Sequence, residues 1–291
     1  MTGVQTCALP ISPDFLCVSQ LVELFTQALD ELRYAQKVWG DSPAIQATIA
    51  WISRQQGQSE SGTRQFTLFR GAITTMRRAY PQFMAAGGED LPRDVLTVIF
   101  PIAYWDLIQK HAAQRNLDPY LVAALIAQES TFVPDIRSSS HAVGLMQLLP
   151  STARQVARVL KLKYSLRLLT NPETNIQLGT AYLADMINRF SELHLALASY
   201  NAGPHRVVKW IAERPDVDRE EFIDDIPFSE TQNYVKRILG TAEDYRRLYG
   251  GEPPRGDGEV EAKGAPASRR KAASAPAEKA PALKGTPAPK K

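Results

Sequence analysis

One glutamate in the sequence stands where it could donate a proton. Residues 119–130 read PYLVAALIAQES, and Asp118 before them is a favourable N-cap with proline at the first helical position. In the helix that this predicts, Glu129 lies four residues after Leu125 and so on the apolar face. A carboxyl group at the end of an apolar face is partly desolvated, which favours the neutral acid that a proton donor needs. A lone glutamate more often pairs with an arginine or reaches solvent, so Glu129 needs further support.

That support comes from the segments that follow Glu129-Ser130. The sequence GLMQ at residues 144–147 lies in a turn-rich loop ahead of a helix predicted to begin near Ser151. The sequence YNAG at 200–203 joins two short predicted helices. The sequence IPFSET at 226–231 opens a last helix, where Ser229 and a glutamine three residues later have the form of a capping box. Each segment alone is weakly specific, whereas the four in this order are highly specific.

In this order and spacing the four segments resemble the soluble lytic transglycosylase family, over roughly residues 100–248. Its members have a lysozyme-like helical catalytic domain that cleaves the glycan strands of bacterial peptidoglycan. The resemblance implies that Glu129 is the catalytic acid and base. It also implies substrate contacts by Ser138, near an N-acetyl group; by Met146 and Gln147, along the groove; by Tyr200, at the reacting sugar; by Asn201; and by Glu230, on the groove wall.

Two of these positions have simpler readings. Glu230 would be the second residue of its helix, where a carboxylate suits the helix dipole with no substrate at all. We therefore give groove function and a structural role equal weight for Glu230. His141 stands where the family usually has a small residue, and we expect it to point to solvent.

The distribution of acidic residues bears on the mechanism. After Glu129 the next acid is Asp135, and none lies between Arg137 and Glu173, so no second catalytic carboxylate is obvious. Ordinary glycosidases use two carboxyl groups. The resemblance implies instead that the N-acetyl group of N-acetylmuramic acid attacks its own anomeric carbon. The C6 hydroxyl then closes a 1,6-anhydro ring, with no water, metal or cofactor.

Two alternatives remain open. A lysozyme-type hydrolase on the same fold would need a second carboxylate or an activated water. A non-catalytic glycan-binding protein or helical scaffold would need neither, but an unpaired carboxylate in an apolar helix then lowers stability without a function.

Composition excludes several other classes of protein. The 291 residues are 44% hydrophobic and 22% charged, with a net charge of +3, and no run of about 18 apolar residues suggests a membrane helix. Residues 251–291 hold nine Lys/Arg against five Asp/Glu, which leaves 25 against 26 for the rest. Residues 1–250 therefore carry almost no net charge, which argues against nucleic-acid binding by this part of the chain. Two cysteines, Cys7 and Cys17, without a C-x-x-C pair predict neither a disulfide scaffold nor a structural zinc site.

The chain divides into four parts in this interpretation, and the fold class is all-α. Residues 1–12 (MTGVQTCALPIS) look like a translated adapter, which is not native protein. Residues 13–90 carry three amphipathic helices, one around 21–32, one from Pro43 and one over 63–80, in an α-superhelical or linker region. Residues 91–250 form the lysozyme-like domain, where 95–102 is the one candidate strand and Pro101 weakens it. Residues 251–291, rich in Ala, Pro and Lys, are expected to be disordered.

These assignments imply a setting for the protein. We expect a monomer in the periplasm or cell envelope that acts on peptidoglycan glycan strands, although no signal peptide is visible. The basic runs 269–271 and 290–291 offer weak contact to anionic cell wall or membrane, but a solvated tether is the favoured reading.

Overall fold

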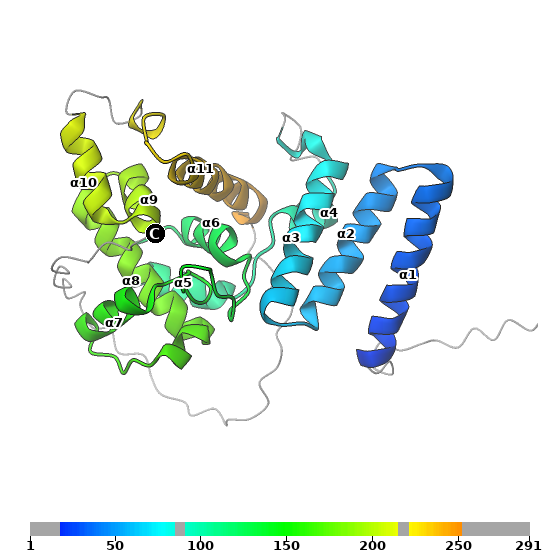
Figure 1. Ribbon diagram of the computed structural model, residues 1–291, viewed down its shortest axis with the longest axis horizontal. Coiled ribbons are helices and arrows are strands. Elements are labelled where there is room, and N and C mark those ends of the chain that lie inside the picture. The colour runs from blue at the N-terminus through cyan, green and yellow to red at the C-terminus, as the bar shows by residue number, and fades with distance from the viewer. Residues whose placement is uncertain (1–17, 85–90, 215–220, 252–291) are drawn as a thin grey trace, which may run out of the picture.

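The computed structural model describes residues 18–84, 91–214 and 221–251 (Figure 1). Within these ranges the chain is all-helical, as predicted, and its extended pairing is confined to the isolated bridges Arg137–Val143 and Val143–Leu148. The predictions for residues 1–12, for the domain boundary at 86–90 and for the tail beyond 251 lie outside the described residues. No helix in these ranges is both long and apolar enough to cross a bilayer.

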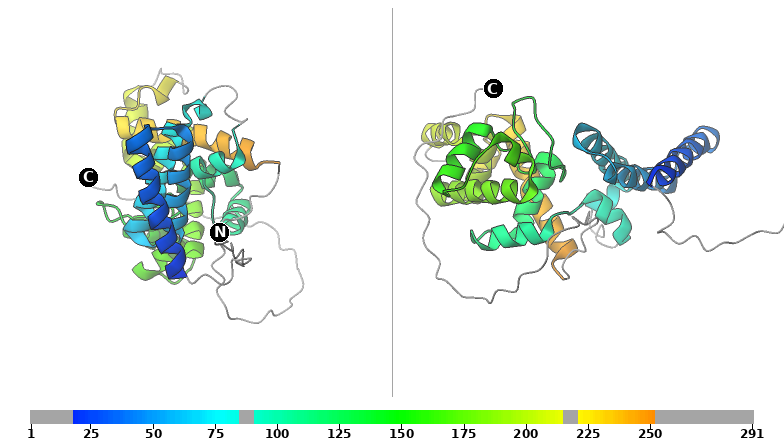
Figure 2. Two further views of the ribbon diagram at one scale, coloured as in Figure 1. Left: turned by 90° about the vertical axis from the view of Figure 1, so that its right-hand side faces the viewer. Right: turned by 90° about the horizontal axis from the view of Figure 1, so that it is seen from below.

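Three helices stand side by side at the N-terminal end of the described chain: α1 (Val18–Trp39), α2 (Pro43–Gln58) and α3 (Gly62–Ala79) (Figures 1 and 2). Their bounds confirm the three predicted amphipathic helices. Ser42 caps α2 by accepting a hydrogen bond from the Ile45 N–H at 3.2 Å, and Pro43 follows at the first helical position. Ala50 on α2 and Ala72 and Met76 on α3 are buried and belong to the hydrophobic core.

A short 3₁₀ turn (Pro81–Met84) follows α3, and α4 (Arg93–Ile99) and α5 (Trp105–Ala113) come after it. The strand suggested for residues 95–102 is wrong, because residues 95–99 are helical. Val95, Leu96, Val98 and Ile99 are buried and only Thr97 between them is half-buried, so a run this short does not distinguish a helical period from a buried strand.

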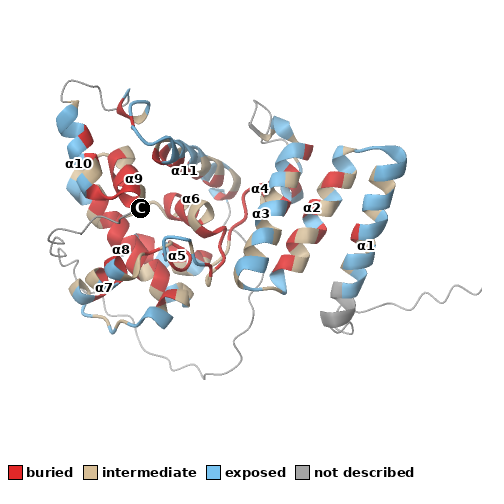
Figure 3. Ribbon diagram, in the orientation of Figure 1, coloured by how far each residue is buried: buried red, intermediate tan, exposed pale blue. Residues whose placement is uncertain are grey.

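Six helices complete the structure, together with 3₁₀ turns at Leu166–Thr170 and Glu221–Ile223. They are α6 (Pro119–Ser130), α7 (Pro150–Val159), α8 (Pro172–Phe190), α9 (Leu193–Ala202), α10 (Pro204–Glu213) and α11 (Ser229–Tyr249). Buried residues concentrate in α6, α8 and α9, whereas α1–α3 are largely exposed or half-buried (Figure 3). The core therefore lies in the C-terminal group of helices, and α11 packs along α6 at its edge (Figure 1).

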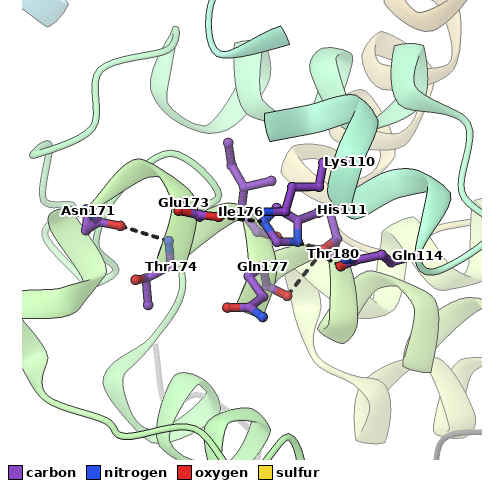
Figure 4. A network of polar contacts seen from close by, with 9 residues as sticks. All are labelled: Lys110, His111, Gln114, Asn171, Glu173, Thr174, Ile176, Gln177 and Thr180. Atoms are coloured by element: carbon purple, nitrogen blue, oxygen red, sulfur yellow. Dashed lines mark hydrogen bonds and ion pairs between the residues drawn. The ribbon is translucent and has the colours of Figure 1, made fainter. Parts of the chain in front are cut away.

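A polar network joins α5 to the start of α8 (Figure 4). Lys110 Nζ forms an ion pair with Glu173 Oε1 at 2.5 Å, and Asn171 caps α8 by accepting from the Thr174 N–H at 3.0 Å. The His111 imidazole beside them is 3% exposed, with Nδ1 3.1 Å from Gln114 Oε1. Burial lowers the pKa of His111, which favours the neutral imidazole in the folded protein.

The two groups of helices touch at several polar contacts. Asp135, in the loop after α6, accepts from the Gly62 N–H at the start of α3 at 2.9 Å. On α11 the Tyr249 hydroxyl donates to the Phe100 carbonyl at 2.8 Å, and the Tyr245 hydroxyl donates to the Pro101 carbonyl. The first contact joins the start of α3 to the loop after α6, and the other two join α11 to the segment that follows α4.

Candidate active site

An open cleft of about 400 Å³ lies where the ends of α6 and α9 meet the beginning of α11. Three of the sequence-predicted site residues line it: Glu129, Asn201 and Glu230. Four residues that the sequence analysis did not single out line it as well: Gln128, Asn233, Tyr234 and Arg237. The structure thus brings together side chains from positions 128 to 237 of the chain.

Glu129 lies half-buried in the last turn of α6. The helix ends at Ser130 because Thr131 adopts a left-handed conformation, with φ 52°, while its N–H still bonds to the Ala127 carbonyl at 3.1 Å. The Ser130 hydroxyl is fully buried and donates to the Ile126 carbonyl at 3.1 Å. The acidic side chain therefore projects from a fixed helix end, with the apolar face of α6 behind it.

Tyr234 fixes one oxygen of that carboxyl group. Its hydroxyl donates to Glu129 Oε1 at 2.7 Å, across 105 positions of sequence. Burial, reinforced by the negative charge of Glu129, raises the pKa of Tyr234 well above 10, so the phenol keeps its proton and remains a donor. Since Oε1 accepts this bond, a proton on the carboxyl group would be better placed on Oε2. Tyr234 lies four residues after Glu230 and hence on the same helix face, which is the sequence signal that could have identified it.

The wall of the cleft opposite Glu129 is formed where α9 meets α11. Thr231 donates its hydroxyl proton to Asn201 Oδ1 at 2.7 Å, so the hydrogens that the Asn201 amide offers to a ligand are those on Nδ2. Glu230 is exposed and lines the cleft in the first turn of α11. The predicted capping box is wrong: Phe228 is the N-cap, Ser229 is the first helical residue, and the Gln232 side chain donates to the Asp224 carbonyl at 2.6 Å.

A tight loop at residues 143–148 lies beside the cleft and is held by a buried asparagine on α8. Asn175 is fully buried: its Oδ1 accepts from the Met146 N–H at 2.8 Å. Its Nδ2 donates to the carbonyls of Val143 at 3.0 Å and Leu169 at 2.9 Å. Gly144 has φ 86° in this loop, and a Cβ there would lie 2.2 Å from Asn175 Nδ2. Sequence reasoning missed Asn175, because nothing local marks an asparagine in mid-helix as a loop anchor.

The remaining predicted site residues belong to this loop or brace it. Met146 is fully buried, and Gly179 on α8 lets it pack closely. The Tyr200 hydroxyl donates to the Met146 carbonyl at 2.8 Å. The Gln147 amide donates to the Gly144 carbonyl at 2.8 Å, and Ser138 Oγ accepts from the Ala142 N–H at 3.0 Å. None of these four predicted residues is among those that line the cleft.

Two further positions bear on the mechanism. His141 is exposed at φ 65°, in agreement with the expectation that it points to solvent. Asp135, the next acid after Glu129, is bound to the Gly62 N–H and does not line the cleft. The carboxyl groups of the cleft are those of Glu129 and Glu230. Across the described ranges, no group of three or more His, Cys, Asp or Glu side chains is placed to hold a metal ion.

Comparison with known proteins identifies similar chains. Residues 106–223 match the family model described as the transglycosylase SLT domain. The soluble lytic murein transglycosylase of Escherichia coli K12 is 36% identical over 164 residues, which is 55% of this chain and 25% of that protein. The transglycosylase of enterobacteria phage PRD1 is 34% identical over 108 residues, 36% of this chain and 37% of that one. The chain thus spans about a quarter of the length of the E. coli relative.

Solved structures resemble the fold over more of the chain. An inactive variant of lytic transglycosylase Slt from Pseudomonas aeruginosa, with glutamine in place of a glutamate, superposes with a TM-score of 0.58. It is 27% identical and covers 82% of this chain and 38% of its own. A 70-kDa soluble lytic transglycosylase in complex with bulgecin A gives a TM-score of 0.56 at 27% identity, covering 81% of this chain and 36% of its own.

Proposed function

The chain belongs to the soluble lytic transglycosylase family, and from this premise we propose that it cleaves the bond between N-acetylmuramic acid and N-acetylglucosamine in peptidoglycan. One observation carries the proposal: Glu129 stands half-buried at the wall of an open cleft, with Oε1 held by a tyrosine that stays protonated. This arrangement suits a group that first donates and then accepts one proton.

The proposed reaction uses Glu129 twice. Neutral Glu129 gives the proton on Oε2 to the glycosidic oxygen as the bond from that oxygen to the muramic acid anomeric carbon breaks. The oxygen of the muramic acid N-acetyl group bonds to the anomeric carbon. The Glu129 carboxylate next takes the proton of the C6 hydroxyl, whose oxygen displaces the N-acetyl oxygen and closes the 1,6-anhydro ring. Atoms balance without water, and Glu129 returns to its starting form.

The other cleft residues have supporting roles in this proposal. Asn201 offers Nδ2 hydrogens to sugar oxygens, and Glu230 accepts sugar hydroxyl protons at the mouth of the cleft. Tyr200, Met146 and Asn175 hold the loop that carries Gln147, so their contribution is to position the groove. Ser138 remains a proposed contact to an N-acetyl group, because its hydroxyl can still donate while it accepts from Ala142.

The setting follows from the same premise. We propose a monomer of the periplasm or cell envelope, with residues 13–90 as a helical region that precedes a catalytic domain over 91–250. The murein transglycosylases named above act on cell-wall polymer, which supports this location.

The Glu129→Gln substitution tests the role of Glu129. The amide keeps the shape and can still accept from Tyr234, but it has no acidic proton, so cleavage of purified peptidoglycan should fall by at least about a hundredfold. Thermal unfolding of the variant should resemble that of the wild type. Near-wild-type cleavage by Glu129→Gln would remove Glu129 from the mechanism.

A hydrolase is the second candidate, and the presence of Glu230 in the same cleft favours it. The two candidates differ in the product: an anhydro end contains no oxygen from solvent, whereas a hydrolytic reducing end does. Digestion in oxygen-18 water should give unlabelled anhydro ends, with Glu230→Gln losing at most about tenfold as a substrate contact. Labelled reducing ends, together with a loss for Glu230→Gln as large as that for Glu129→Gln, would establish the hydrolase instead.

A further inference from the structure

The surface formed by α7 and the chain on either side of it is strongly basic. Between Asp135 and Glu173 the sequence holds six Lys/Arg and no acidic residue, whereas the rest of residues 1–250 hold 19 Lys/Arg against 26 Asp/Glu. All six cations are exposed, and we call them the basic surface: Arg137, Arg154, Arg158, Lys161, Lys163 and Arg167.

None of these cations is neutralised by a neighbouring acid. Within the described ranges no member of the basic surface forms an ion pair. The two acids that flank it in sequence are engaged elsewhere: Asp135 accepts from the Gly62 N–H, and Glu173 pairs with Lys110. Like charges gathered in this way repel one another, and an anionic partner relieves that repulsion.

The helical period turns the cations of α7 outward. Arg154 and Arg158 lie four residues apart on the exposed side of the helix, and the buried side chains of Ala153, Val156 and Ala157 occupy the other side. The core therefore holds one side of α7 in place and presents the other side, with its two guanidinium groups, to whatever lies outside.

The chain after α7 folds back on the helix and extends the same surface. Lys161 adopts a left-handed conformation with φ 54°, two residues after the helix ends. The Tyr164 hydroxyl then donates to the Pro150 carbonyl at 3.0 Å, and the Arg154 guanidinium lies 5.7 Å from the centroid of the Tyr164 ring. Lys163, the neighbour of Tyr164, is thereby held close to the arginines of α7.

One large apolar side chain is exposed among these cations. Leu166 begins the 3₁₀ turn Leu166–Thr170 and is 45% exposed, and the exposed Arg167 follows it directly. Cations around an exposed apolar group are typical of peripheral binding to a bilayer: the cations attract anionic headgroups, and the apolar group enters the boundary of the acyl chains. A dissolved polyanion offers no such environment to Leu166, so the combination favours a lipid surface.

The position of α7 keeps this surface apart from the cleft. In two views related by rotation about the vertical axis, α7 lies at the bottom of the C-terminal group of helices and α11 at its top (Figures 1 and 2). No residue of the basic surface lines the cleft. A partner bound to the basic surface therefore leaves Glu129 accessible.

We propose that the basic surface docks the protein on the anionic face of a phospholipid bilayer. Clusters of four to eight Lys/Arg bind anionic lipid headgroups, and the basic surface, with six, has this size. The contact is peripheral and needs no spanning helix. It is independent of the chemistry at Glu129, and it would hold the cleft at a fixed distance from the membrane.

Cosedimentation of the full chain with lipid vesicles tests the docking. The vesicles contain either phosphatidylcholine alone or equal parts of phosphatidylcholine and phosphatidylglycerol. We expect binding to the anionic vesicles, release from them at high salt, and no binding to the neutral ones. Equal binding to both kinds of vesicle, or binding to neither, would overturn the proposal.

A triple substitution locates the binding on the molecule. Arg158→Gln/Lys161→Gln/Lys163→Gln leaves Arg154 on the Tyr164 ring, so folding should survive, as thermal unfolding checks. One cation near an anionic bilayer contributes about fivefold to partitioning, so the loss of three should weaken binding about a hundredfold.

The matched control for the triple substitution removes three charges from the tail instead. Arg269→Gln/Arg270→Gln/Lys271→Gln changes the net charge equally and should weaken vesicle binding by no more than about threefold. Equal losses in the two variants would assign the binding to net charge, and a loss confined to the control would assign it to the tail. Either result refutes docking through α7.

Leu166 distinguishes a bilayer from a dissolved polyanion. Leu166→Ala should weaken vesicle binding about fivefold, because the apolar group no longer leaves water. Leu24→Ala, at a position of α1 that is 50% exposed, is the matched control and should bind like the wild type. If Leu166→Ala also binds like the wild type, and soluble dextran sulfate displaces the protein from vesicles, the surface is a polyanion site and the proposal fails.

Cleavage of soluble glycan fragments separates this proposal from the proposed function. The triple Gln variant should cleave them at the wild-type rate while it fails to bind vesicles, because its substitutions lie outside the cleft. Vesicle binding by a wild type that cleaves no glycan would support the docking and contradict the proposed function. Cleavage by a wild type that binds no anionic vesicle would contradict the docking alone.

Discussion

Replacing Gly144 by alanine tests whether the loop at 143–148 depends on a backbone that only glycine allows. Gly144 has φ 86°, a conformation that costs an L-residue about 1–2 kcal/mol. The added Cβ would also lie 2.2 Å from Asn175 Nδ2 and 2.3 Å from the Leu169 carbonyl oxygen. Neither atom can move freely, because Nδ2 is hydrogen-bonded on both sides and the carbonyl is backbone.

The expected loss of stability follows from these contacts. Moving Asn175 away breaks its bonds to the carbonyls of Val143 and Leu169, and an unsatisfied buried group costs about 1–3 kcal/mol. With the backbone strain, Gly144→Ala should lower the free energy of unfolding by about 2–5 kcal/mol. For a domain of this size that corresponds to a fall in Tm of about 4–20 °C.

The assay is thermal unfolding followed by circular dichroism, with peptidoglycan cleavage measured below the transition. Gly240→Ala is the matched control: a Cβ at this position of α11 meets no atom within 4 Å, so the same change should raise stability by about 0.5–1 kcal/mol. Cleavage should fall in Gly144→Ala and stay unchanged in Gly240→Ala. If Gly144→Ala unfolds at the wild-type temperature, the close approach of Asn175 to this loop does not matter energetically and the argument fails.

Two further predictions concern single side chains. Tyr234→Phe removes the donor to Glu129 Oε1 and should reduce cleavage about tenfold. Tyr249→Phe also loses a buried hydroxyl hydrogen bond on α11, so it should lower Tm about as much as Tyr234→Phe does but leave cleavage unchanged. Equal activities of the two variants would show that the Tyr234 hydroxyl has no role in cleavage. Because burial lowers the pKa of His111, the unfolded chain binds more protons than the folded one just below pH 6.5, so the free energy of unfolding should fall by up to about 1.4 kcal/mol per pH unit as pH drops through that window. His111→Gln should flatten this slope in denaturant titrations between pH 7 and 5, and an unchanged slope would assign it to other groups.

Local signals were sufficient for most helices of this chain. Asp118 with Pro119 predicts a helix start because the cap and the proline act within one turn, and the structure confirms it. Asn171 with Pro172 has the same form at the start of α8. The apolar period of residues 63–80 predicts α3 for the same reason: it depends only on neighbours three and four positions away.

Local signals failed where distant contacts decide the structure. Four of the five residues at 95–99 are buried, and a run of five residues is too short for its pattern to distinguish helix from strand. Ser229 has the form of a cap, yet Phe228 takes that place, with its ring packed 5.2 Å from that of Trp210 on α10. Tyr234 and Asn175 act across 105 and 29 positions of sequence. No window of sequence contains such pairs.

The distance in sequence between the two walls of the cleft also sets an order of events in synthesis. Glu129 belongs to the middle of the chain, but Tyr234 and Glu230 belong to its last described helix. A nascent chain that has emerged only through α10 therefore has the acid without the opposite wall or the hydroxyl that orients it. Because chains are made from the N-terminus, docking of α11 on α6 is the step that completes the cleft. Under the proposed function, the site that cleaves the glycan therefore forms only after α11 has been synthesised and has docked on α6.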